Sequence, residues 1–290
     1  MLKLKFTRAW VMSAALVSAA GCVLYALLGD QRDLRVEEVA VALPGWPAAV
    51  APARVVLLAD LHAARGDGDW VDEQVRTAIA LQPEAVILLG DYHKGADAAL
   101  NMPMDELARR LAPLRQQCPV YYVRGNHDRL KRAIEVNRHF KAQGFTAIES
   151  ADAQLNFANG CRALLRGFSY RHELEPVGSQ RKRFSAKALP ADQPLLVASH
   201  TPWHFMNQPL HGALVVCGHT HGGMICYPGG HPVSGVDSWT GSMLRGGMHR
   251  GKVPGQQIYV SRGTGSSSFP VRIFCPPEIT LLLLGGADKK

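Results

Sequence analysis

The chain has little charge, few aromatic residues and no repeated segment. Charged residues make up 19% of the 290 residues and aromatic residues 7%, whereas hydrophobic residues reach 47%. A sequence with so much apolar content can bury a core, so intrinsic disorder is excluded. No internal repeat or low-complexity tract occurs, so nothing points to a repeat architecture.

Two motifs of covalent and redox chemistry are absent. The six cysteines include no C-x-x-C pair, and five remain once Cys22, in an apolar N-terminal stretch, is set aside. An odd count does not settle the redox compartment. The sequence also lacks the G-x-S-x-G elbow of many hydrolases, so Ser199 beside His200 is a poor candidate for a nucleophilic serine.

No basic segment is interleaved with aromatic residues, so we expect no specific nucleic-acid partner. The formal net charge of +8 still suits an anionic partner, such as a phosphorylated substrate or an acidic membrane surface. A basic surface with no specific partner is an equally good explanation of this positive charge.

Only one long hydrophobic run exists, an uncharged stretch from Ala9 to Leu28 that follows Lys3, Lys5 and Arg8. Its length matches the ~20 residues that cross a bilayer. A cleaved signal peptide has a shorter apolar region of roughly 7–15 residues. We therefore predict a retained membrane helix within residues 1–28.

Lipoprotein processing at Cys22 is the alternative, because residues 19–22 read Ala-Ala-Gly-Cys. The apolar residues that continue after Cys22 disfavour it. Three basic residues precede the helix and two, Arg32 and Arg35, follow it. This difference of one charge favours a cytoplasmic N-terminus. We predict a single-pass membrane protein with its domain on the outer face.

Five short apolar runs rich in Val, Leu and Ile predict buried strands of an α/β sheet. Each run is followed within three residues by a residue that can bind a metal. In open α/β sheets the ligand site lies outside the carboxyl ends of the strands, so these ends predict one polynuclear centre. The runs are Val55–Ala59, Val86–Gly90, Val120–Val123, Leu195–Ser199 and Leu214–Cys217, followed by Asp60, Asp91, Asn126, His200, and the pair His219 and His221.

The same order of elements fixes the expected domains. Because Asp60 and His221 must meet, no domain boundary falls between them, and we predict an anchor over 1–28, a linker and first strand over 29–53, and one catalytic domain over 54–290.

The first strand, Val36 to Leu43, is expected to pair beside the strand that precedes Asp60. Helices are predicted over Trp70–Leu81, Met104–Gln117 and Leu130–Gln143, which alternate with the strands. The polar segment His172–Pro190, with three consecutive basic residues, is either a loop that meets phosphate or a solvated excursion.

Four motifs and the single residue His200 carry the metal-binding residues. Asp60-Leu61-His62 is common and weak alone, and Asp91 after Gly90 adds a carboxylate that can bridge two cations. Gly125-Asn126-His127-Asp128 is more specific, because an amide, an imidazole and a carboxylate follow one another on a tight turn. In the strongest motif, Gly218 to Gly223, His219 and His221 can reach two neighbouring ions while the glycines admit close backbone approach.

This order of motifs resembles the calcineurin-like metallophosphoesterases, whose pattern runs D-x-H, G-D, G-N-H-D, H and G-H-x-H. The resemblance extends from about Val36 through residues 270–274 and 277–280, which are similar to the ending of the membrane-anchored bacterial branch of the YkuE and YaeI type. One departure is Met224, where that branch usually has glutamine. The fold that the resemblance implies is a four-layer αββα sandwich of two mixed β-sheets, preceded by one transmembrane helix.

The resemblance also implies a ligand set and a mechanism. One metal would be held by Asp60, His62 and His221, a second by Asn126, His200 and His219, with Asp91 bridging. Such ligands suit Mn, Fe or Zn without choosing among them. Two ions about 3.5–4 Å apart lower the pKa of a bound water toward ~7 and clamp the phosphoryl oxygens, so that hydroxide attacks phosphorus in line. His127 would protonate the leaving oxygen, and Asp128 would orient His127.

Substrate contacts are less defined. His93, Arg124 and Arg262 lie near predicted strand ends and are candidates for binding substrate oxygens, although His93 also fits a surface loop. Some relatives cleave the pyrophosphate of UDP-2,3-diacylglucosamine, a cytoplasmic lipid A intermediate, which conflicts with the outward orientation inferred above. The alternatives are an outward-facing phosphodiesterase or phosphatase with another substrate, and a non-catalytic membrane-tethered scaffold, which the complete ligand set disfavours.

Overall fold

The structure is a computed structural model, and it describes residues 10–14, 16–18, 20–21, 31–47, 49–95, 97–129, 131–149, 151–168, 170, 193–206, 210–233, 245–266 and 271–286. Residues 10–14, 16–18 and 20–21 are helical. Across the described ranges, no helix is both long enough and apolar enough to cross a membrane. The expected loop over residues 172–190 lies outside these ranges, as does most of the expected anchor.

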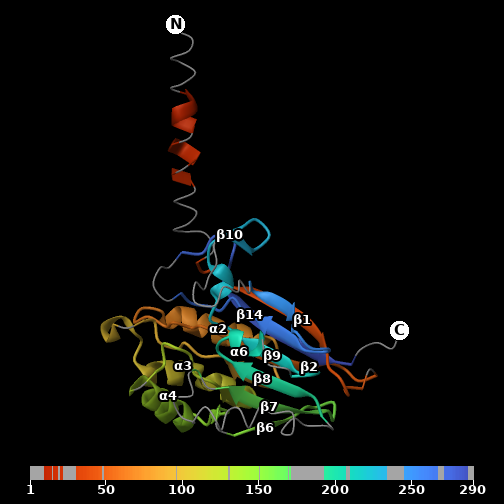
Figure 1. The fold of residues 1–290 in the computed structure, drawn as a ribbon. Helices are drawn as coiled ribbons and strands as arrows, with labels where there is room; N and C mark the ends of the chain where they lie inside the picture. The colour runs from red at the N-terminus through yellow and green to blue at the C-terminus, as the bar shows by residue number, and fades with distance from the viewer. Residues whose placement is uncertain are drawn as a thin grey trace.

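The first large sheet has six strands and is mixed (Figure 1). Four of its strands run parallel to one another, while β14 runs antiparallel to β2 and parallel to β1. In spatial order the strands are β1 (Arg35–Ala42), β14 (Glu278–Gly285), β2 (Ala53–Leu58), β3 (Ala85–Leu88), β4 (Val120–Tyr122) and β5 (Thr146–Ala147).

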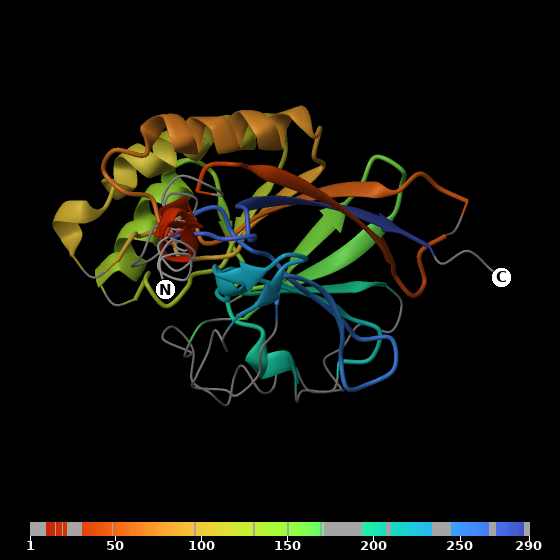
Figure 2. The ribbon, with the colours of Figure 1, turned by 90° about the horizontal axis from the view of Figure 1, so that it is seen from above.

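Three helices cover the outer face of this sheet: α2 (Gly68–Ala80), α3 (Met104–Gln117) and α4 (Lys131–Ala142). Figure 2 shows α2 and α3 lying along one side of the molecule. Their apolar faces form one buried cluster with alternate residues of β2, β3 and β14. A short 3-10 turn, η1 (Ala98–Leu100), precedes α3. All three predicted helices are confirmed to within two residues at each end.

The second large sheet is also six-stranded and mixed. Its central strands β13, β9, β8 and β7 are parallel, and an antiparallel strand closes each edge. The order is β12 (Gly247–Arg250), β13 (Gln257–Val260), β9 (Leu214–Cys217), β8 (Leu195–Ser199), β7 (Arg162–Phe168) and β6 (Ala153–Asn156). The remaining described elements are α6 (Trp203–Met206), η4 (His221–Gly223) and the hairpin of β10 (Cys226–Tyr227) with β11 (His231–Pro232).

The two sheets pack face to face through an apolar core. Leu57 of β2, Ile87 of β3 and Leu282 of β14 belong to the same buried cluster as Leu196 of β8 and Val216 of β9. The mixed α/β fold with two large sheets is thus confirmed. On the outer face of the second sheet the described residues supply only the four-residue α6, so the fourth layer stays a prediction.

The expected neighbour of the first strand is wrong. β1 does form, but it pairs along all eight residues with β14, and β14 separates it from β2. The reason is burial: β14 reads Glu-Ile-Thr-Leu-Leu-Leu-Leu-Gly and is buried along most of its length, whereas β1 is largely exposed. A strand buried on both faces belongs inside a sheet, and a half-exposed strand belongs at its edge.

We predict that Leu282→Ala lowers the free energy of unfolding by about 2–5 kcal/mol, the range for a large-to-alanine change in a packed core. Leu282 is fully buried in β14, between Val39 of β1 and Val55 of β2. Urea unfolding measures the change. Ile134→Ala on α4 is the control, because Ile134 is 69% exposed and its loss is expected to change stability by about 0.5 kcal/mol or less. An equal loss of unfolding free energy for the two substitutions would contradict the position of β14 inside the sheet, between β1 and β2.

Candidate metal centre

The loops that follow β2, β3, β4, β8 and β9 meet at one end of the two sheets. Backbone hydrogen bonds join them directly: the amide of Asp60 donates to the carbonyl of Gly90 (3.0 Å), and the amide of Gly218 donates to that of His200 (3.0 Å). The His200 ring links the two sheets, because its Nδ1–H donates to the carbonyl of Leu89 (2.9 Å). All seven residues that the sequence predicts as ligands stand on these loops, and we refer to them together as the candidate metal centre.

Left-handed backbone conformations aim these side chains. In the described chain eight non-glycine residues have positive φ angles, and five of them belong to the candidate metal centre. Each such residue costs about 1–3 kcal/mol and persists only where its surroundings enforce it. This strain at strand ends is a mark of function that the sequence pattern does not display. The five are Asp60, His62, Asp91, His219 and His221, with φ between 41° and 72°.

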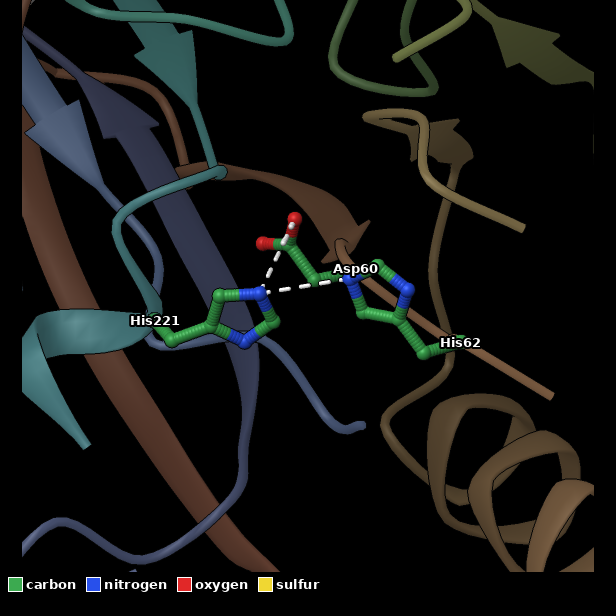
Figure 3. Close-up of side chains that lie close together, drawn as sticks. All are labelled: Asp60, His62 and His221. Carbon is green, nitrogen blue, oxygen red and sulfur yellow. Dashed lines mark hydrogen bonds and ion pairs between the residues drawn. The ribbon is translucent and has the colours of Figure 1, made fainter. Parts of the chain in front are cut away.

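The first group of converging side chains is Asp60, His62 and His221 (Figure 3). Their ligand atoms lie within 4.8 Å of one another. The two Nε2 atoms of His62 and His221 are 3.2 Å apart, and Nε2 of His221 lies 3.9 Å from a carboxylate oxygen of Asp60. All three residues are buried. This is the trio that the family resemblance implies for one metal.

The second group is Asp91, His200 and His219, whose ligand atoms also lie within 4.8 Å of one another. Nε2 of His200 is 3.0 Å from Nδ1 of His219, 3.0 Å from Oδ1 of Asn126 and 3.3 Å from Oδ2 of Asp91. The same oxygen of Asp91 is 3.5 Å from Nε2 of His62, which belongs to the first group. Asp91 therefore stands between the two groups, where a bridging carboxylate has to be.

Charge within the centre is divided unevenly. Burial alone would raise the pKa of Asp91 and lower that of His200, but their mutual attraction holds Asp91 well below its usual range and raises His200 to about 9. Burial raises the pKa of Asp60 to about 7, an effect that His200 opposes and Asp91 reinforces. His200 lies close to both carboxylates, 3.3 Å from Asp91 and 3.9 Å from Asp60.

The other three imidazoles are neutral, as metal ligands must be. Burial lowers the pKa of His62 to about 4 and that of His219 to about 3. Burial, together with His62, also lowers the pKa of His221 well below its usual value.

The donor set fits a divalent cation. His62 donates its Nδ1–H to the carbonyl of His93 (2.8 Å), so Nε2 of the neutral ring presents a lone pair. That lone pair faces Nε2 of His221, and Nδ1 of His221 is buried with no hydrogen-bond partner in the described structure. Two neutral imidazoles directed at each other beside a carboxylate suit Mn, Fe or Zn better than Ca or Mg.

Glycines let these loops approach one another. A Cβ atom on Gly125 would overlap the carboxylate of Asp91, and one on Gly218 would lie 2.5 Å from a carboxylate oxygen of Asp60. Gly263 also approaches Asp60, since its Cβ would lie 2.7 Å from the Cβ of Asp60. Our sequence-based reasoning missed this third glycine, although Gly-Thr-Gly at residues 263–265 is a visible signal of close backbone approach.

The expected contact between Asp128 and His127 is not the one found. The carboxylate of Asp128 accepts hydrogen bonds from the backbone amides of Asp91 (2.7 Å), Tyr92 (3.0 Å) and Gly125 (3.0 Å). Its ring partner is His93, whose Nδ1 lies 2.9 Å from Oδ1. His93 is accordingly buried and is no surface loop residue. Asp128 fixes the loop that carries the bridging Asp91, and the His127 imidazole lies instead 4.0 Å from Oδ2 of Asp91.

The two arginines proposed to contact substrate have partners inside the fold. Arg124 is buried and paired with Glu149, with Nη2 2.6 Å from Oε2. Arg262 pairs with Glu37 of β1 (2.6 Å) and Glu278 of β14 (3.0 Å). Both guanidinium groups therefore stabilise the framework around the centre, and the ion pairs weigh against the predicted substrate contacts.

A family comparison agrees with this geometry. The sequence profile of the calcineurin-like phosphoesterases matches residues 53–223, which is more than half of the chain and runs from β2 to η4. The chain belongs to this family. It is therefore a metal-dependent hydrolase of phosphoesters, and its His and Asp groups are the candidate metal sites.

Individual relatives are distant. Phosphodiesterase YaeI of Escherichia coli (strain K12) is 28% identical over 81% of this chain and 83% of its own length. A transmembrane protein with a metallophosphoesterase domain from Danio rerio is 23% identical over 93% of this chain, which spans 62% of that protein. The crystal structure of a dimetal phosphatase from Danio rerio aligns with a TM-score of 0.45 and 14% identity over 76% of this chain and 90% of its own. So loose a structural likeness carries no weight for function.

We predict that the affinity of the chain for Mn²⁺ rises with pH because His200 must lose a proton to become a ligand. Its pKa is raised to about 9, so His200 is protonated below that value and the metal has to displace the proton. The association constant should increase about tenfold per pH unit between about pH 7 and 9 and level off above. Anaerobic calorimetric titration in buffers of different ionisation enthalpy measures both affinity and proton release. A constant affinity across this range would contradict the assignment of His200.

We also predict that Asp128→Asn lowers the free energy of unfolding by about 2–4 kcal/mol, because an amide nitrogen replaces an oxygen that accepts buried backbone N–H groups. His127→Ala is the matched comparison and should change stability by about 1 kcal/mol or less, because its side chain is 26% exposed. Thermal and urea unfolding of metal-free protein measure both. If Asp128→Asn reduced turnover with unchanged stability, its role would be the orientation of His127 after all.

Proposed function

We propose that the chain is a binuclear metal-dependent phosphoesterase that hydrolyses a phosphodiester or pyrophosphate bond. One observation carries the proposal: the Asp91 carboxylate lies between two groups of buried ligands, 3.5 Å from His62 and 3.3 Å from His200. The ligand sets are those given above, with Asn126 completing the second. When bound, two divalent ions supply activation of water and polarisation of the phosphoryl group.

His127 is the residue that we assign to the leaving group. Its backbone amide donates to Oδ1 of Asp91 (2.8 Å), which fixes the start of its side chain. Its imidazole is 26% exposed, whereas the side chains of His62 and His200 have no exposed surface. An imidazole that reaches the surface beside the ligand groups is placed to donate a proton to the leaving oxygen of a substrate.

We further propose that the N-terminal segment anchors the domain to a bilayer, as a single pass of the bacterial inner membrane. Five apolar side chains in this segment are at least 66% exposed: Trp10, Val11, Met12, Leu16 and Val17. Exposed apolar helical surface of this kind requires an apolar partner, and lipid is the partner that the uncharged sequence from Ala9 to Leu28 suits. The basic residues on either side favour a periplasmic domain.

An anchored hydrolase meets membrane-associated substrates at high local concentration, and the name of YaeI as a phosphodiesterase supports a diester. UDP-2,3-diacylglucosamine, a lipid-linked pyrophosphate, is our first candidate substrate. Its cytoplasmic location conflicts with the orientation inferred from charge. The second candidate is therefore an outward-facing phosphodiesterase or phosphatase with another substrate.

The proposed chemistry is tested with the full-length chain in detergent, treated with chelator and reloaded with Mn or Zn. We expect metal-dependent cleavage of bis(p-nitrophenyl) phosphate, abolished by Asp91→Ala. Cleavage of UDP-2,3-diacylglucosamine would establish the lipid substrate and place the domain on the cytoplasmic side. Cleavage of the aryl ester alone would favour the outward-facing enzyme. No metal-dependent activity on these esters or on p-nitrophenyl phosphate would favour a non-catalytic scaffold.

The role of His127 has its own test. His127→Ala should bind Mn normally and lose most of its kcat on an alkyl phosphodiester, by about 10²–10⁴-fold, the usual contribution of general acid–base catalysis. The loss should be smaller on bis(p-nitrophenyl) phosphate, whose leaving group needs no proton. Equal losses on the two esters would contradict a proton donor.

A further inference from the structure

A pocket with a volume of about 230 Å³ adjoins the candidate metal centre. Leu61 and His62, which follow Asp60, line one side, and residues 264–266 line another. Trp70 of α2 also lines it. His62 belongs both to this pocket and to the first ligand group, so the pocket and the centre are adjacent.

The pocket is strongly cationic. Three of its lining residues, Arg32, Lys94 and Arg272, carry positive charge, and Asp67 is the single carboxylate among the lining residues. Asp67 is already paired with Arg32 at 3.1 Å. Among the residues that the structure describes, no carboxylate forms an ion pair with Lys94 or Arg272. Asp67 attracts Lys94, and Asp60 and Glu278 attract Arg272, but none of these carboxylates pairs with either cation. The lining itself has three cations and one carboxylate beside a site for phosphoesters.

Lys94 is the more available of the two. Arg272 is fully buried and donates to the carbonyls of Arg262, Gly265 and Cys275. Lys94 is only about half buried, and its ammonium group donates to the carbonyl of Ser266 (2.6 Å). Burial lowers the pKa of Lys94, so an anion in the pocket would restore the stability of its charged form.

We propose that this pocket binds a second phosphate-type anion of the substrate, with Lys94 as its principal ligand. The proposal rests on the proposed function, because the scissile phosphoester is placed at the candidate metal centre. A pocket of this volume has room for a phosphate and several attached atoms. It would select pyrophosphates and phosphorylated diesters over diesters with a single negative charge.

The position of the pocket along the chain agrees with an amphipathic substrate. Gln31 and Arg32 line it and follow the proposed membrane segment, which ends at Leu28, by three and four residues. Four residues span at most roughly 14 Å, so the pocket lies within reach of the headgroup layer. The second phosphate can thus belong to a lipid headgroup or to a soluble molecule.

The test uses two esters that differ by one phosphate: thymidine 5′-(p-nitrophenyl phosphate) and the same compound with a 3′-phosphate. With the Mn-loaded full-length chain in detergent, we expect kcat/KM to be about tenfold or more higher for the 3′-phosphorylated ester, mainly through KM. Lys94→Met should remove this preference, and Lys94→Arg should keep it. Lys141→Met on the exposed face of α4 is the control and should change nothing.

The outcomes separate this proposal from the proposed function. Equal kcat/KM for the two esters in the wild type, or an equal loss on both in Lys94→Met, would overturn the pocket assignment and leave the hydrolase intact. Absence of Mn-dependent cleavage of either ester would overturn the proposed function itself.

A competition experiment identifies the source of the anion. Glycerol 3-phosphate and mixed micelles of phosphatidate present the same headgroup chemistry in soluble and lipid form. A competitor that occupies the pocket raises KM for the 3′-phosphorylated ester in the wild type and much less in Lys94→Met. If the phosphatidate micelles raise this KM, the second phosphate belongs to a lipid headgroup. If glycerol 3-phosphate raises it, the second phosphate belongs to a soluble molecule. Failure of both competitors would overturn the assignment.

Discussion

Two buried carboxylates at one end of the sheets set the constraint on which this structure depends. Asp60 and Asp91 have almost no exposed surface, and a buried negative charge is tolerated only with a positive partner. His200 supplies that charge from the opposite sheet, 3.3 Å from Asp91 and 3.9 Å from Asp60. The two sheets are therefore joined by an apolar core along their faces and by an electrostatic contact at the end that carries the chemistry.

The apolar core stabilises the fold against the cost of the strained backbone at the centre. Five left-handed residues at the strand ends store about 1–3 kcal/mol each, which the packing between and behind the sheets must offset. Asp128 connects the site to this framework, because its carboxylate accepts hydrogen bonds from the backbone amides of Asp91, Tyr92 and Gly125. The loop that carries the bridging Asp91 is thus held by hydrogen bonds within the protein.

The sequence predicted local structure well and distant contacts less well. The strands before His200 and His219 and the helix Met104–Gln117 were predicted to the residue, because continuous apolar runs and amphipathic spacing are local signals. The partner of β1 was missed because strand pairing depends on residues far along the chain. Asp128 was assigned to its neighbour His127, yet the turn directs its side chain to His93. Arg124 stands near a strand end as a phosphate ligand would, and only the fold reveals its partner Glu149.

The place of β14 has a consequence for biosynthesis. Arg35 at the start of β1 is paired with Glu278, about 240 residues further along the chain. At roughly 5–20 residues per second of translation, β1 waits on the order of ten to fifty seconds for its partner. Throughout that time β1 and the edge of β2 that faces away from β3 lack their partner strand. The backbone N–H and C=O groups along these edges can pair with another chain until β14 is made.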